Sequence, residues 1–301
     1  MSSPRPIVNS LLITLLAVSS ASAETSLTVL YDAFGPAGAF ERDWGFSALL
    51  RHDGRNILID TGSDPGVFAR NAARAGVDLA NLDAVILTHR HMDHLGGLPA
   101  VLAEKPQVPI YAPHEPFGQF GSELPASIYS RDGSLPRHLR FFDGRPPASL
   151  RFGSAWPDAA IVPVTGHREI FPGVHLLANR TEHMDSHGLH EVSLAIETPR
   201  GLVVIVGCSH PGVESIVASA QAIDTPVALV VGGFHLPAAT DEAIDRTSAA
   251  LKALGVGAVA PAHCSGEVTM ARLREQWHGR FVETGVGRRI DLEPGSAEPA
   301  G

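Results

Sequence analysis

The chain is poor in cysteine, in basic residues and in charge overall. Two cysteines in 301 residues cannot form a disulfide framework. A chain of this length buries roughly three quarters of its unfolded surface, so it needs none. Its 23 lysines and arginines against 32 acidic residues give a net charge of −9 and no basic stripe for a nucleic acid. With 44% hydrophobic and 18% charged residues, the composition excludes an intrinsically disordered protein.

The apolar stretch near the N-terminus, residues 7–18, is too short to cross a membrane comfortably. Arg5 precedes it, and the small residues Ala21-Ser22-Ala23 follow it. This order is typical of a secretory signal peptide. We predict a signal peptide over residues 1–23, export to a bacterial periplasm and no stable membrane anchor after cleavage. A retained anchor is the alternative; a lipoprotein would need a cysteine at the cleavage point.

Short apolar stretches alternate with helical ones along the rest of the chain. Strand patterns cover residues 27–31, 46–51, 56–60, 84–88, 108–111, 161–164, 174–178, 192–197, 202–206, 227–231, 258–261 and 281–283. Helix patterns cover residues 65–75, 93–103, 213–223, 240–254 and 268–277. This order predicts an α/β fold with two sheets face to face and helices outside, an αββα sandwich.

One domain accounts for the chain more economically than two, and we place it over residues 24–293. Within it, residues 113–160 are rich in glycine and proline and lose periodicity, while keeping scattered aromatic residues. A long aperiodic stretch inside a compact domain is often a functional loop, so we expect an irregular excursion that acts as a lid. Residues 294–301 form a flexible Pro/Gly/Ala tail.

Histidine is the unusual component, with 15 residues. His89, His91, Asp93 and His94 fall within six positions, between a predicted strand and a predicted helix. Imidazole and carboxylate suit a divalent metal of the zinc type. His89 and His91 can turn one way while Asp93 and His94 face a second point, so the motif predicts two neighbouring metal sites. The alternative is a helix cap with surface histidines.

The segment His89-Arg90-His91-Met92-Asp93-His94 resembles the His-x-His-x-Asp-His signature of the metallo-β-lactamase fold superfamily. The resemblance extends to Leu58-Ile59-Asp60-Thr61-Gly62 and over essentially the whole mature chain. It implies the αββα fold and a role for Asp60 in orienting a metal ligand by a hydrogen bond. The alternative for Asp60 is a turn residue before Gly62.

The superfamily commonly has Gly-Asp after a later strand, where the aspartate bridges two metals. This chain has Gly207-Cys208 there, followed by Ser209-His210. A thiolate is also an anionic metal ligand, and His210 could reach the same centre. We predict metal contact for Cys208 and His210; an accidental triplet at a strand end is the alternative.

Two further strand patterns end in histidine, at Gly232-Gly233-Phe234-His235-Leu236 and at Pro261-Ala262-His263-Cys264. With Gly-Cys-Ser-His, these blocks resemble the subgroup of archaeal dihydropterin/ribofuranosylaminobenzene 5′-phosphate synthase and metal-dependent hydrolases. The resemblance implies that His263 is the last ligand of the second metal and that His235 faces the substrate as a proton donor. A strand-end histidine with a structural partner is the alternative for His235.

Two questions stay open in the sequence. The third histidine of the first metal is either His210, which we prefer because its triplet marks the subgroup, or His187. The other loop histidines, His167, His183 and His190, are then expected to be solvated. Cys208 and Cys264 either remain thiols or join in a disulfide, which would remove Cys208 as a ligand.

The resemblance implies a dinuclear metallohydrolase with a small-molecule substrate, and the predicted signal peptide makes it an exported one. Two divalent ions, zinc or else manganese or iron, would activate a hydroxide that attacks an ester-, phosphoester- or lactam-type bond. Asp93 would bind metal and orient the nucleophile, and His235 would protonate the leaving group. The alternatives are a true β-lactamase, which the missing Gly-His-Thr-Pro-Gly motif and Cys208 disfavour, and a non-catalytic metal- or ligand-binding module.

Overall fold

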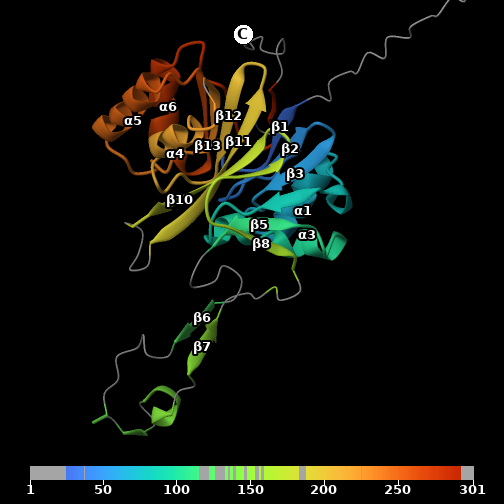
Figure 1. Cartoon of the computed structure of the whole chain (residues 1–301), viewed down its shortest axis with the longest axis vertical. Coiled ribbons are helices and arrows are strands. Elements are labelled where there is room, and N and C mark those ends of the chain that lie inside the picture. The colour runs from blue at the N-terminus through green and yellow to red at the C-terminus, as the bar shows by residue number, and fades with distance from the viewer. Residues whose placement is uncertain are drawn as a thin grey trace, which may run out of the picture.

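Two sheets packed face to face, with helices on both outer sides, make up the molecule in a computed structural model (Figure 1). The structure describes residues 25–36, 38–114, 122–125, 133–134, 136–137, 140–145, 148–152, 156, 159–182, 188–224 and 226–292. The αββα sandwich predicted from the sequence is confirmed. The predicted signal peptide and tail lie outside the described residues.

The first sheet has seven strands in the order β15-β1-β2-β3-β4-β5-β8. Their bounds, in chain order, are Ser26–Tyr31, Ser47–His52, Arg55–Ile59, Ala84–Ile86, Ile110–Pro113, Ile161–Val164 (β8) and Arg289–Asp291 (β15). Three helices follow its strands: α1 (Pro65–Arg74), α2 (Met92–Leu95) and α3 (Leu98–Glu104). The N-terminus of α1 is set by Asp64, whose carboxylate accepts bonds from the N–H groups of Gly66 and Val67.

The second sheet has six strands in the order β14-β13-β12-β11-β10-β9. From β9 to β14 they are Arg168–Phe171, Val174–Thr181, Leu189–Thr198, Gly201–Val206, Val227–Gly233 and Ala258–Ala262. Its outer face carries α4 (Val213–Ala220), α5 (Asp241–Ala253) and α6 (Glu267–Gln276). A separate pair, β6 (Ser122–Pro125) and β7 (Ser149–Phe152), lies within the stretch predicted to be irregular; its role as a lid stays a prediction.

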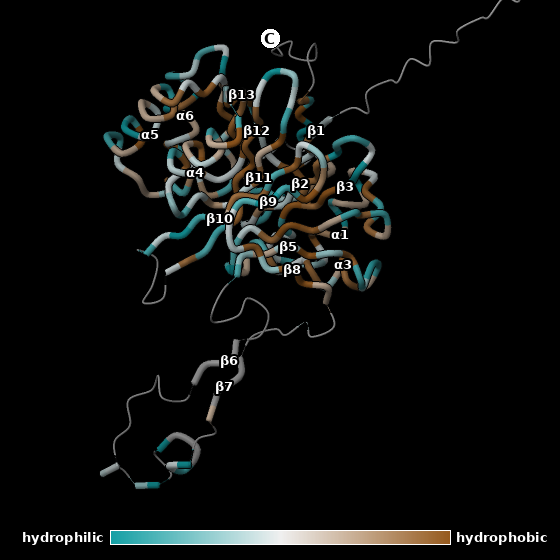
Figure 2. The backbone as a smooth tube through the Cα atoms, in the orientation of Figure 1, coloured by the Kyte–Doolittle hydropathy of each residue, from teal (hydrophilic) through white to brown (hydrophobic). Residues whose placement is uncertain are grey.

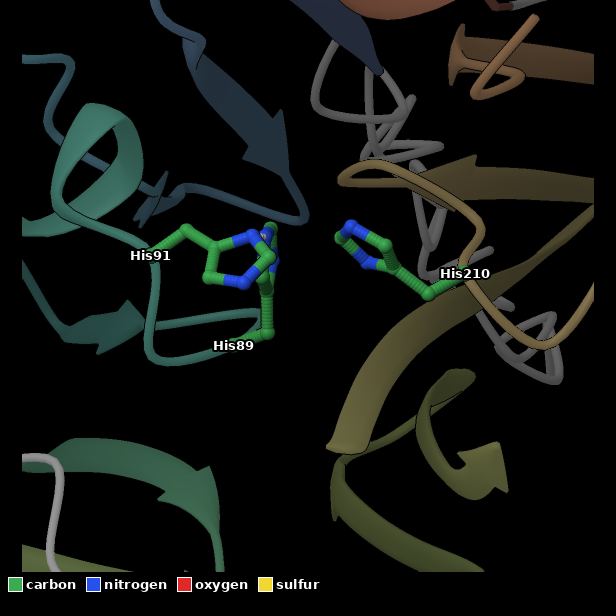
Figure 3. A group of neighbouring side chains, drawn as sticks. All are labelled: His89, His91 and His210. Atoms are coloured by element: carbon green, nitrogen blue, oxygen red, sulfur yellow. Dashed lines mark hydrogen bonds between the residues drawn. The ribbon is translucent and has the colours of Figure 1, made fainter. Parts of the chain in front are cut away.

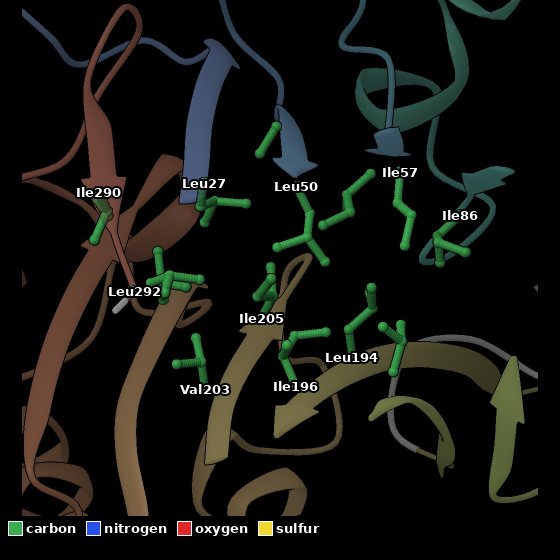
Figure 4. Close-up of a cluster of buried hydrophobic side chains, with 14 of the residues drawn as sticks. Leu27, Leu50, Ile57, Ile86, Leu194, Ile196, Val203, Ile205, Ile290 and Leu292 are labelled. Carbon is green, nitrogen blue, oxygen red and sulfur yellow. The ribbon is translucent and has the colours of Figure 1, made fainter. Parts of the chain in front are cut away.

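Three apolar layers hold the sandwich together, and Figure 2 shows that the hydrophobic residues are concentrated along the sheets. The central layer lies between the two sheets and includes Leu50, Ile57, Leu194 and Ile205 (Figure 4). β12 contributes alternately, since Val203 and Ile205 enter this layer whereas Val204 and Val206 pack under the helices. Burial on both faces explains why its sequence is one continuous apolar run.

The helix predicted over residues 93–103 is divided into α2 and α3 at Gly96-Gly97. A Cβ atom on Gly96 would lie 1.8 Å from the Ser63 carbonyl oxygen, and one on Gly97 would lie 2.2 Å from that of Thr61. The loop after β3 therefore presses against this point. Only glycine allows such an approach, and the single-helix prediction was wrong because the contact is tertiary.

Two sheet edges also differ from the prediction. The last strand was predicted over residues 281–283, but Phe281 makes only an isolated bridge with Val259. The edge strand is instead β15, which pairs with β1 and has just three residues. β9 was missed in the same way. Both are short edge strands with little apolar pattern, so pairing rather than composition defines them.

All the strands that matter for the site end on the same edge. β3, β4, β12, β13 and β14 each lead at their carboxyl end into one of the polar motifs. Within the described part of the chain, no helix is long and apolar enough to cross a membrane.

Candidate metal centre

The loops after three strands bring the predicted ligands to one place between the sheets. His89 follows β4, His210 follows β12 and His263 follows β14. Figure 3 shows His89 and His91 on one side with the ring of His210 facing them from the other. Residues widely separated in the sequence thus meet at one rim, as expected for the carboxyl ends of neighbouring strands.

The first donor set consists of His89, His91 and His210. One ring nitrogen of each lies within 4.8 Å of the others. His89 Nε2 is 3.1 Å from His91 Nδ1, and the ring centroid of His210 is 4.6 Å from that of His89. Of the two residues left open by the sequence, His210 therefore lies with this pair, while His187 lies outside the described residues.

The second donor set consists of Asp93, His94 and His263, whose ligand atoms also lie within 4.8 Å of one another. Asp93 Oδ2 is 3.3 Å from His263 Nε2 and 3.9 Å from His94 Nε2. The side chains of both histidines are fully buried, whereas that of Asp93 is 22% exposed. The carboxylate is therefore the part of this set that solvent reaches.

Cys208 lies between the two sets. Its Sγ is 3.2 Å from His94 Nε2, and with His89 and His94 it forms a further group of donors within 4.8 Å of one another. The side chain is buried, and both Cys208 and Cys264 are free thiols in this structure. A thiolate at this point could contact cations held by either set.

Asp60 fixes the orientation of His94. Its Oδ2 is 2.6 Å from His94 Nδ1, and its two oxygens accept bonds of 2.7 Å from the N–H and hydroxyl groups of Thr88. The residue is fully buried and has a positive φ of 51°, a conformation that non-glycine residues adopt only when the surroundings enforce it. With Nδ1 held, Nε2 of His94 is left to face Cys208 and Asp93.

Glu191 is a support that the sequence analysis missed. This fully buried residue on β11 accepts the backbone N–H groups of Cys208, Ser209 and His210 at 2.7–3.0 Å. Its Oε2 is also 2.9 Å from His210 Nδ1. Burial raises the pKa of Glu191, but these contacts outweigh it and hold the pKa below its ordinary value. The one available signal was a charged residue at the start of an apolar strand.

Asp32 supports the other end of the centre in the same way. Both of its oxygens lie 3.2 Å from the backbone nitrogen of His263. Burial raises the pKa of Asp32 to about 6. The sequence analysis missed this residue too, although it follows directly on the strand β1.

The residues present fit a divalent cation. The Nε2 atom of His210 and both ring nitrogens of His263 are buried and have no hydrogen-bond partner among the described residues. Buried polar atoms without a partner are costly, so they need an explanation. Two three-donor sets of imidazole and carboxylate with a thiol between them suit metals of the zinc type.

A family model described as the metallo-β-lactamase superfamily matches residues 45–263. The match runs from just before β2 to His263 and so contains every donor of both sets. The chain belongs to the metallo-β-lactamase superfamily. The resemblance drawn from the His89–His94 motif is confirmed, and membership implies that the centre binds divalent metal.

Full-length relatives of this superfamily support the same assignment. The 7,8-dihydropterin-6-methyl-4-(β-D-ribofuranosyl)-aminobenzene-5′-phosphate synthase of Methanocaldococcus jannaschii is 28% identical over 291 residues, covering 87% of this chain and 95% of that protein. Tm1679, a metal-dependent hydrolase of the β-lactamase superfamily, superimposes with a TM-score of 0.68 at 26% identity, covering 89% of this chain and 99% of its own. The subgroup inferred from the sequence is confirmed.

More distant members show the fold alone or match one region. YhfI from Bacillus subtilis, a metallo-β-lactamase fold protein, has a TM-score of 0.58 at 16% identity, covering 89% of this chain and 99% of its own. A hydroxyacylglutathione hydrolase of Xylella fastidiosa is 38% identical over 80 residues, which is 27% of this chain and 29% of that protein. The superfamily architecture is therefore shared more widely than the sequence.

Within the superfamily motif, His89 and His91 are held neutral. Burial, followed by the neighbouring imidazoles, lowers the pKa of His89 well below its ordinary value. Burial and then His210 lower the pKa of His91 to about 4. Near pH 7 both rings therefore offer a lone pair, which is the form that binds a cation.

His94 and Asp93 carry the charge of the centre. Burial lowers the pKa of His94, but Asp60 outweighs it and raises the pKa to about 9, so a cation that binds Nε2 of this ring must displace its proton. Burial raises the pKa of Asp93, but His263 and His94 outweigh it and pull the pKa below its ordinary value. The Asp93 carboxylate is therefore ionised, as a ligand for a cation must be.

His235 lies at the open edge of the centre, exposed, with its ring centroid 4.3 Å from that of His210. The other histidines named in the sequence analysis do not join the centre where they are described. His167 contacts His175 at 3.1 Å near β9 and β10, and His190 lies on β11. His183 lies outside the described residues.

Proposed function

We propose that this protein is a metal-dependent hydrolase with a two-metal centre. His89, His91 and His210 would hold one ion, and Asp93, His94 and His263 the other, with Cys208 between them. The observation that carries the proposal is the pair of three-donor sets joined by Cys208, with unpartnered buried nitrogens on His210 and His263.

Two adjacent divalent cations supply a water nucleophile active near neutral pH and polarise the bond to be cleaved. The chain's own residues hold this arrangement rigid. Asp60, Glu191 and Asp32 each fix one ligand or its backbone, and such supports keep ligands in a productive geometry. Asp93, the most open ligand of the second set, is placed to accept a hydrogen bond from the water and orient it.

The substrate is a small molecule with an ester-, phosphoester- or lactam-type bond and an apolar part. The apolar part is supported by Trp44, a residue 50% exposed whose ring centroid is 4.9 Å from that of His263. Met92, between two ligands in sequence, is 61% exposed. Exposed apolar side chains beside a polar centre favour binding of a partly apolar molecule.

The first experiment is a metal count by elemental analysis of protein purified without chelator. We expect at least about two equivalents per chain, and hydrolysis of at least one member of a panel of ester, phosphodiester and lactam probes. His89→Ala should lose metal and turnover together. His278→Ala is the matched control, because this exposed histidine follows α6 at a distance in sequence from every ligand. Full metal occupancy in His89→Ala would refute the ligand assignment.

Export is a separate part of the proposal and rests on the layout of residues 1–23. The mature chain would begin at Glu24. Mass spectrometry of the protein recovered from the periplasmic fraction of its producing cell should give the mass of the chain from Glu24. The mass of the full chain in the cytosol would contradict export and leave the metal centre unaffected.

A further inference from the structure

Two side chains beside the centre, Cys264 and His235, are not used by the proposed pair of ions. Cys264 is 2% exposed, and its sequence neighbours His263 and Ser265 are buried as well. Its Sγ, Sγ of Cys208 and one ring nitrogen of His235 all lie within 4.8 Å of one another. Two buried thiols and an imidazole at such spacing form a donor set of their own, softer than the two described above.

Backbone hydrogen bonds lock the three loops that carry this set. Gly233 N–H donates to the Gly207 carbonyl at 3.0 Å, which ties the His235 loop to the Cys208 loop. Leu236 N–H donates to the Cys264 carbonyl at 3.1 Å, which ties it to the third loop. The backbone therefore holds together the three loops that carry these donors.

The local conformation also leaves room for the thiols. A Cβ atom on Gly233 would lie 2.6 Å from Cys264 Sγ and 3.4 Å from the Cα of Cys208. The glycine is thus what allows the Cys264 side chain to lie against the end of β13. His235 has a positive φ of 50°, and this turn holds its exposed imidazole within 4.8 Å of the two buried thiols.

We propose that Cys208, Cys264 and His235 form a third cation position, which takes a thiophilic divalent ion of the zinc or cadmium class. Each of the two thiols loses a proton when it binds such an ion, and the Cys264 thiolate, which the other two sets do not use, offsets part of the ion's charge in a buried site. Cys208 would be shared with the neighbouring sets. His235 then acts as a ligand, in place of the proton-donor role that the sequence suggested. The inference rests on the proposed function, since it places the third ion beside the other two.

Cadmium is the direct probe, because a cadmium–thiolate bond absorbs in the near ultraviolet in proportion to the number of thiolates. Chelator-treated, reduced full-length protein should bind about three equivalents of Cd²⁺ after desalting. Cys264→Ser should lose one equivalent, and its absorption band should fall to about half because one thiolate of two remains. Unchanged stoichiometry and an unchanged band in Cys264→Ser would overturn the third position.

Wild-type protein gives an independent test if Cys264→Ser does not fold. ¹¹³Cd NMR of the loaded chain should show a third resonance, shifted downfield by sulfur ligands relative to the nitrogen- and oxygen-rich sites. Absence of such a resonance would overturn the proposal. His235→Ala should also lose one equivalent of Cd²⁺; if it kept every ion and lost only turnover, His235 would be the proton donor instead.

Two outcomes of the cadmium titration distinguish failure of the third position from failure of the two-metal centre. If wild-type protein binds about two equivalents with a one-thiolate band, the two-metal centre stands and the third position fails. If the band shows two thiolates and only about one equivalent binds, the thiol site exists and the two-metal hydrolase fails.

Discussion

Two buried histidines of the second sheet differ in one respect that separates a structural residue from a ligand. His175, near the start of β10, has both ring nitrogens in contact, Nδ1 with His167 at 3.1 Å and Nε2 with Glu197 at 2.9 Å. His263, after β14, has no hydrogen-bond partner on Nδ1 among the described residues, and its Nε2 contacts only another candidate ligand there, Asp93 at 3.3 Å. Both belong to clusters of histidines. The protein's own side chains satisfy both ring nitrogens of His175, whereas His263 is left available for a cation. Buried ring nitrogens without a partner therefore indicate a metal ligand better than clustering of histidines does.

Replacing each of these histidines should give the largest contrast. His263→Ala removes a ligand of the second set, so we expect loss of one metal equivalent and a fall in turnover of about 100-fold or more. His175→Ala removes only a satisfied contact at the other end of the sheet and should leave metal content unchanged. Elemental analysis of both variants checks this. Full metal occupancy in His263→Ala would show that the second site is misplaced.

Replacing the carboxylate that contacts a histidine of each cluster should also have unequal effects on metal affinity, with the larger effect at Glu191. Glu191→Gln places an amide NH₂ where backbone N–H groups and His210 point at the carboxylate. We expect metal affinity at the first set to fall by about 10–100-fold, the range for residues that orient ligands. Glu197→Gln is the matched control, since its side chain is 54% exposed and its carboxylate contacts His175, which belongs to neither donor set. Equal affinities in the two variants, measured by competition with a chelator dye, would contradict the role of Glu191.

Metal removal should have a smaller effect, on stability. An ion that binds only the folded chain at 100 times its dissociation constant stabilises it by about 2.7 kcal/mol. Chelation should therefore lower the melting temperature of wild-type protein by several degrees, as measured by calorimetry. The shift should shrink in His263→Ala and persist in His175→Ala. An identical shift in both variants would mean that the chelated ion lies elsewhere.

The grouping of the candidate ligands could be predicted because each lies in a loop that follows an apolar strand. The carboxyl ends of strands that share a layer must meet, so His89, His210 and His263 could be brought together without knowing their distances. The αββα order followed from the same alternation of strands and helices.

The supports could not be predicted, because they depend on tertiary placement. Glu191 and Asp32 are single carboxylates whose partners are backbone N–H groups far away in the sequence. The break at Gly96-Gly97 depends on the loop after β3, and the edge strand β15 depends on pairing with β1. Propensity and periodicity describe a segment, and these features belong to pairs of segments.

The spread of the donors along the chain has a consequence for how the protein matures. A nascent chain that has emerged as far as α3 carries His89, His91, Asp93 and His94, but neither complete set. His210 and His263 arrive only after β12 and β14 have been added to the second sheet. Contacts between such distant segments form late in folding. Loading of the centre would therefore report that both halves of the sandwich have been synthesised and docked, which makes it a checkpoint for completion of the fold.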